Sequence, residues 1–233
     1  MALGAAGDIL SSPSNARRIT TPALTVNAAG ADGGSITVST AVETLTARIT
    51  GGEGGIVVYE RDSVILALLT AQDGSIRVSA GGTITATDVE TLTDRTGDDV
   101  TLIATSGDVL IGYVAAGYVA GAHRYGQVSV YSAHDIREAP PYDATVDLRA
   151  HKALLYARHR IGGQKGADLE LDVDYVYAFT GGATHKEPEW WHWRHSTDVG
   201  FDWLPPRWKA SPLRRPAIRC LLGYGALLRF AVA

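Results

Sequence analysis

Residues 74–86, GSIRVSAGGTITA, contain the pattern on which the fold of this 233-residue chain depends. Ile76 and Val78 alternate with polar residues, so on a β-strand both apolar side chains point to one face and the polar ones to the other. A second short strand-like patch, residues 84–86, follows two glycines that allow a tight corner. One such pair of strands cannot bury its apolar face alone, so it must pack against further copies of the same unit.

The same unit recurs along most of the chain. Each copy begins with an apolar residue that anchors its first strand: Ile36, Ile56, Ile76, Val100, Val128, Val146 and Leu169. These anchors are separated by 20, 20, 24, 28, 18 and 23 residues, and a small residue follows each anchor 9 to 12 positions later. Copies stacked at the strand spacing of about 4.8 Å would share one apolar core and pair their backbones from copy to copy.

The repeat predicts an all-β chain, a single-stranded parallel β-solenoid (right-handed β-helix) of about seven rungs, each rung being one turn of the coil. We expect Ile36, Ile56, Ile76 and Val100 to stack as one inward-facing column. The alternative is an antiparallel β-sandwich, whose strands also recur every 8–12 residues. Recurrence of a two-strand unit, rather than of one strand, favours the solenoid.

Composition changes after residue 180 and predicts two regions. Residues 1–180 hold 21 acidic and 13 basic residues, whereas residues 181–233 hold 4 acidic and 8 basic residues. The first region is the predicted repeat domain, and residues 181–233 form a non-repetitive tail rich in Trp, His and Arg. Three interpretations of this tail remain open: a cap on the solenoid end, an aromatic platform for sugar rings, or a segment read out of frame. The platform would consist of Trp190, Trp191 and Trp193.

The whole-chain composition excludes several classes. A net charge of −4 predicts no nucleic-acid partner. The single cysteine, Cys220, excludes an internal disulfide and an all-cysteine zinc site. No apolar run reaches the ~20 residues of a membrane helix, so we expect no membrane insertion. The first residues, MALGAAGDIL, lack the basic start and long apolar run of a signal peptide.

Acidic residues are the main candidates for chemistry. On the predicted strand 167–178, Glu170, Asp172 and Asp174 would share one face, where they could bind Ca²⁺ or supply an acid/base pair for glycan cleavage. We expect instead that this face is solvated and binds no ion tightly. Asp98 and Asp99 are expected to close the turn before Val100. We therefore predict no catalytic residue, no metal site and no cofactor.

The segments GSIRVSAGGTITA (74–86) and DDVTLIATSGDVLIG (98–112) resemble the repeats of filamentous-haemagglutinin-type large exoproteins. Members of that family are giant bacterial surface or secreted adhesins built as right-handed β-helices. The resemblance covers about residues 20–180 and implies an extracellular or cell-surface location. It also implies that the partners are host or cell-surface glycans or proteins and further β-helix repeats of a longer chain.

The sequence therefore predicts a non-enzymatic structural or adhesive β-helix module of a bacterial exoprotein. One alternative is a carbohydrate-active β-helical enzyme that uses carboxylates such as Asp172 and Asp174. Another is a glycan-binding module that acts through the tryptophans of the tail. The enzyme would need two carboxylates that converge within about 5–10 Å.

Overall fold

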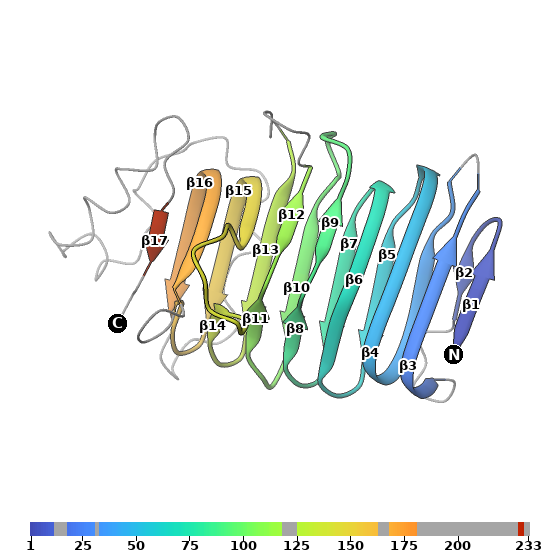
Figure 1. Cartoon of the computed structure of the whole chain (residues 1–233), viewed down its shortest axis with the longest axis horizontal. Helices are drawn as coiled ribbons and strands as arrows, with labels where there is room; N and C mark the ends of the chain where they lie inside the picture. Colours follow the sequence, from blue (N-terminus) through green and yellow to red (C-terminus); the bar gives the residue numbers. More distant parts are fainter. Residues whose placement is uncertain (12–17, 31–32, 118–124, 163–167, 181–227, 231–233) are drawn as a thin grey trace, which may run out of the picture.

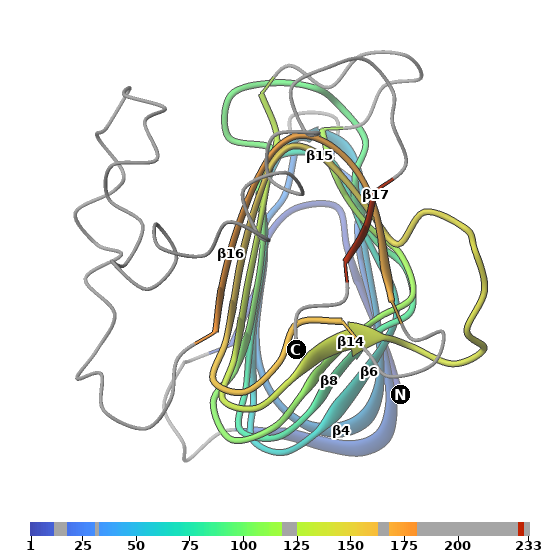
Figure 2. The same ribbon diagram turned by 90° about the vertical axis from the view of Figure 1, so that its left-hand side faces the viewer.

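A computed structural model describes residues 1–11, 18–30, 33–117, 125–162, 168–180 and 228–230 of the chain. These residues contain strands and no helix, and the parallel strands form a β-solenoid of about seven turns. In Figure 1 the strands lie side by side from β1 at the N-terminal end to β16. Figure 2 looks along the coil and shows that successive rungs follow nearly the same outline. The predicted fold class is confirmed.

Each rung has three sides, which we call A, B and C in chain order. Five whole strands lie on side A: β2 (Ile9–Leu10), β5 (Ile56–Glu60), β7 (Ile76–Ala80), β10 (Val100–Ala104) and β13 (Gln127–Ser132). Three longer strands contribute a part each: residues 36–40 of β4 (Ile36–Glu53), residues 152–157 of β15 (Leu148–Ala157) and residues 175–180 of β16 (Leu169–Thr180). Side B includes the first part of β6 (Val64–Asp73), then β8 (Ile84–Ala86), β11 (Val109–Ile111) and β14 (Ile136–Glu138). Side C includes β1 (Ala2–Ala5), the last part of β3 (Ile19–Ala28), β9 (Val89–Thr91), β12 (Val114–Ala116) and the first parts of β15 and β16.

The predicted inward column is present on side A. Parallel register pairs Ile36 with Ile56, Ile56 with Ile76, and Ile76 with Val100. All four side chains are fully buried, so the residue that follows each of them on its strand faces outward. The column continues to Val128.

The anchors of the last two copies were predicted wrongly. Val128 pairs with Ala153, not Val146, and Ala153 pairs with Val176. The segments that hold the predicted anchors Val146 and Leu169, residues 144–148 and 167–171, instead lead into side C, where Leu148 pairs with Leu171. The error has a physical cause: all three sides carry the same alternation of apolar and polar residues. A single copy therefore does not reveal which side it occupies.

The tail is described only at strand β17 (Leu228–Phe230), which pairs antiparallel with residues 169–171 of β16. The proposed platform of Trp190, Trp191 and Trp193 lies outside the described residues. So does the rest of the region that the composition assigns to the tail.

Candidate functional site

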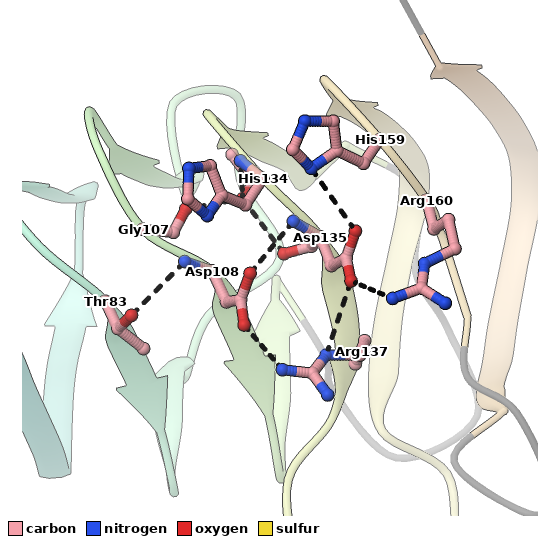
Figure 3. Close-up of polar contacts among 9 residues, drawn as sticks. Thr83, Gly107, Asp108, His134, Asp135, Arg137, His159 and Arg160 are labelled. Carbon is pink, nitrogen blue, oxygen red and sulfur yellow. Dashed lines mark hydrogen bonds and ion pairs between the residues drawn. The ribbon is translucent and has the colours of Figure 1, made fainter.

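A ladder of side chains runs along the corner between sides A and B. Each member accepts a hydrogen bond from the backbone N–H of the equivalent residue in the next rung. Ser63 Oγ accepts from Thr83 N at 2.9 Å, Thr83 Oγ1 from Asp108 N at 3.3 Å, and Asp108 Oδ1 from Asp135 N at 3.0 Å. Figure 3 shows the last two of these steps. The corner is therefore held by side chains where the backbone turns away from sheet pairing.

Arginines surround the end of this ladder. Arg160 donates to Asp135 Oδ2 at 2.8 Å, and Arg137 donates to Asp108 and lies 4.0 Å from Asp135 (Figure 3). The hydrogen bond and the charge of Asp135 raise the pKa of Arg160. These contacts join neighbouring rungs and balance the two carboxylates, as a structural ion network does.

Two histidines stack beside the ladder. His134 and His159 occupy equivalent places in successive rungs, and their ring centroids are 5.2 Å apart with an interplanar angle of 30°. Nδ1 of His159 lies 4.0 Å from Oδ1 of Asp135 (Figure 3). From the sequence alone, His134 and His159 are expected on different rungs, without the spacing of metal ligands. The register brings them into contact.

A second group of polar residues is buried at the C-terminal end of the coil. One carboxylate oxygen from each of Glu138, Asp147 and Glu170 lies within 4.8 Å of the others, and all three residues are buried. Glu138 ends β14 on side B, Asp147 precedes the side C strand of the same rung, and Glu170 lies at the start of side C in the next rung. Two hydrogen bonds also join the last two residues: Asp147 N donates to the backbone carbonyl of Glu170 at 2.9 Å, and Glu170 N donates to the Asp147 side-chain oxygen Oδ2 at 3.0 Å.

The environment of this cluster disfavours negative charge. Burial raises the pKa of Asp147 to about 8, and the neighbouring carboxylates of Glu138 and Glu170 act in the same direction. Burial also raises the pKa of Glu138, with contributions from Glu170, Asp143 and Asp168. Among the described residues, no lysine or arginine forms an ion pair with Glu138 or Asp147. The three carboxylates can coexist here if they share protons or a cation.

This environment predicts a pH dependence of stability when no divalent cation is present. Asp147 has a higher pKa in the folded chain, about 8, than its ordinary value of 3.8. The folded state therefore holds a proton that the unfolded state has lost, and stability falls as the pH rises from about 4 to about 8. Urea midpoints measured in chelator at pH 5 and pH 8.5 should differ more for the wild type than for Asp147→Asn. Equal pH dependence of the two proteins would refute this assignment.

Glu170 corrects an expectation from the sequence. It was predicted to share a solvated face with Asp172 and Asp174, but it is only 2% exposed, and Leu169 and Leu171 on either side are also buried. The strict alternation fails because Glu170 lies at the start of side C, bonded to Asp147 below and paired with β17.

The other two predicted acidic residues lie away from this core. Asp172 contacts Arg149 at 3.6 Å, and Asp174 is exposed and bonds to Nδ1 of His151 at 2.8 Å. Each is therefore held by a basic side chain of the preceding rung. Asp99 Oδ1 accepts from Gln127 N at 2.9 Å, as expected for a residue that organises the turn before Val100.

Sequence reasoning missed Glu138 and Asp147. The available signal was the comparison of repeats: register aligns Glu138 with Ile111, Ile111 with Ala86, and Ala86 with Leu66. Arg137 stands two residues before the small residue of its copy, where the other copies carry an apolar residue, so the sequence marks it as the irregular one; in the structure it faces outward opposite Leu110. The irregular residue is the next one, an acidic side chain at an inward position.

Comparison with known proteins yields no relative: no family model, no curated protein and no solved structure matches the chain. Within the described residues, no helix has the length and apolar character to cross a membrane. The fold and the local geometry are therefore the basis for any statement about function.

Proposed function

We propose that this chain is a non-enzymatic structural or adhesive module, a β-helix segment of a bacterial cell-surface or secreted exoprotein. The observation that carries the proposal is side A. Seven successive strands, from residues 36–40 to residues 175–180, pair in parallel from rung to rung. Such a coil makes a rod with one long continuous face, which suits display and attachment. The likeness of its repeats to filamentous-haemagglutinin-type exoproteins supports the same role.

The outer surface of side A supports adhesion in particular. Register places Tyr131, Tyr156 and Phe179 in one outward column on three consecutive rungs. Tyr177 belongs to the neighbouring outward column, and Lys152, four residues before Tyr156 on the same strand, places its Nζ 5.2 Å from the centre of the Tyr177 ring. Aromatic rings at the rung spacing of about 4.8 Å present flat apolar surfaces with polar edges. The apolar faces of sugar rings stack on such surfaces, so we favour a host or cell-surface glycan as the partner.

Binding of the full chain to immobilised polysaccharides and to whole cells tests this proposal. We expect retention on at least one glycan, and a loss of about tenfold or more for Tyr131→Ala combined with Tyr156→Ala, since removing a stacked ring costs about 1.4 kcal/mol or more. The matched control is Tyr59→Ala. Tyr59 belongs to the same column but lies between Ser39 and Ser79, without an aromatic neighbour above or below it.

The same samples distinguish adhesion from catalysis. Release of reducing ends or of unsaturated sugars from a bound polysaccharide would contradict the non-enzymatic proposal and favour the carbohydrate-active enzyme. Retention on no glycan and on no cell surface would contradict adhesion. Equal loss of binding in the Tyr59→Ala control would show that the aromatic column of the last rungs is not the contact surface.

A further inference from the structure

Glu138 occupies a position that belongs to the apolar core. On side B, the inward column runs through Leu45, Leu66, Ala86 and Ile111 before it reaches Glu138. Glu138 is 3% exposed, so its carboxylate lies where four preceding rungs place hydrocarbon. Burying a carboxylate there is costly unless its oxygens find partners.

Two other buried carboxylates, those of Glu60 and Asp98, have hydrogen-bond donors on both oxygens. Glu60 accepts from the backbone N–H groups of Val42, Arg61 and Asp62, at 3.1, 2.7 and 3.1 Å. Asp98 accepts from Gly74 N, Arg95 N and the Thr93 hydroxyl, at 2.7 to 2.8 Å. These residues organise corners without any need for a ligand. A third, Asp135, has one buried oxygen without a hydrogen-bond partner, but Arg160 pairs with its other oxygen at 2.8 Å.

Glu138 differs from all three of them. Its Oε1 accepts from Asp143 N at 2.7 Å, whereas its Oε2 is buried and has no hydrogen-bond partner. Its carboxylate belongs to the cluster in which one oxygen of each of Glu138, Asp147 and Glu170 lies within 4.8 Å of the others. A buried, unpartnered carboxylate oxygen in a group of acidic residues is the arrangement that a cation completes.

The chemistry of these ligands indicates the cation. All three groups are hard oxygen donors, which bind Ca²⁺ and Mg²⁺ rather than soft metals. Oxygens on opposite sides of Ca²⁺ are about 4.6–5.2 Å apart, whereas Mg²⁺ requires about 4.0–4.2 Å in near-ideal octahedral geometry. Oxygens within 4.8 Å of one another that come from two rungs and a connecting loop suit the flexible coordination of Ca²⁺ better than the near-ideal octahedron that Mg²⁺ demands.

We propose that Glu138, Asp147 and Glu170 form a Ca²⁺ site at the C-terminal end of the solenoid. The ion joins Glu138, at the end of side B, to Asp147, at the start of side C of the same rung, across the loop formed by residues 139–147. It also joins both of them to Glu170, on side C of the next rung. The ion offsets two of the three negative charges and links two rungs at the end of the described coil. This site is independent of the adhesive surface on side A.

Thermal unfolding of the full chain, freed of metal by chelation and then titrated with CaCl2, tests the proposal. We expect the melting temperature to rise by roughly 5–10 °C at a Ca²⁺ concentration a hundredfold above Kd. Titration calorimetry should give one site per chain. MgCl2 at the same concentration should produce a clearly smaller shift.

Three variants make the test specific. Glu138→Gln and Glu138→Leu should both abolish the response to Ca²⁺, and Glu138→Leu, which restores the residue found at Leu45 and Leu66, should melt higher than the wild type in chelator. Asp172→Asn combined with Asp174→Asn is the matched control and should keep the full response, since these acidic residues lie outside the cluster.

Several outcomes would overturn the site. One is a wild-type melting temperature that does not change up to about 10 mM CaCl2, a concentration ten times the dissociation constant of the weakest extracellular calcium sites. Another is an unchanged response in Glu138→Leu or Glu138→Gln, which would place the ion elsewhere. A response lost only in the Asp172 and Asp174 double variant would assign the ion to the exposed carboxylates. Equal stabilisation by Mg²⁺ would contradict the choice of calcium.

Discussion

Replacing Ile76 by alanine is expected to lower the free energy of unfolding by about 2–5 kcal/mol. Ile76 is fully buried and lies in register between Ile56 and Val100, so its truncation leaves a cavity that contacts three rungs. Because each rung of a solenoid is stabilised mainly by its neighbours, the weakened interface also allows the two halves of the coil to unfold separately. Urea denaturation followed by circular dichroism measures both effects.

Arg77→Ala is the matched control for this prediction. Arg77 is the next residue on the same strand, but it is exposed and pairs outward with Val57 and Thr101. Its replacement should change the free energy of unfolding by no more than about 0.5 kcal/mol. Similar losses for the two variants would contradict the inward column on side A.

Gly74→Ala is expected to destabilise the fold by about 3–5 kcal/mol, the second large effect. Gly74 has a φ of +126°, a conformation that residues with a side chain rarely adopt. A Cβ there would also lie 2.4 Å from the carbonyl oxygen of Gly54 in the preceding rung. Since that contact is with backbone, relief requires the two rungs to separate at this corner.

The Gly97→Ala variant separates the cost of the positive φ from the cost of the clash between rungs. Gly97 also has a positive φ, +109°, but a Cβ added there meets no atom within 4 Å. This variant should lose only the conformational part, about 1–2 kcal/mol. Chemical denaturation of both variants gives the difference. If Gly97→Ala were as damaging as Gly74→Ala, close stacking of the rungs would not be the reason for the glycine at position 74.

At the corners of the coil, the local sequence predicted some acidic residues correctly and others wrongly. Asp98 and Asp99 were assigned to the turn before Val100 from their type and position alone. Asp98 accepts from Arg95 N and from the Thr93 hydroxyl within that turn, and both aspartates accept from backbone N–H groups of neighbouring rungs. Glu170 was assigned to a solvated face by the same alternation rule, which fails where a strand crosses a corner and gains a partner. The rule describes the middle of a strand, whereas burial at a corner depends on the rung above.

The sequence by itself determined the solenoid and the approximate number of rungs. Each copy carries its own alternation of apolar and polar residues, and that alternation recurs whether or not the neighbouring rungs are known. Ile36, Ile56, Ile76 and Val100 could therefore be aligned from spacing alone, because no long insertion separates their copies and each begins a pair of apolar residues two positions apart.

Only the tertiary structure decided which side of the coil each later copy occupies. The loop at residues 139–147 lengthens one rung, and the same alternating pattern marks sides A, B and C, so spacing no longer identifies the register beyond Val128. Register in turn decides which side chains meet. It places Glu138 in an apolar column beside Asp147 and Glu170, and it stacks His134 on His159. Residues more than twenty positions apart become neighbours only through backbone pairing between rungs, and no local pattern encodes that contact.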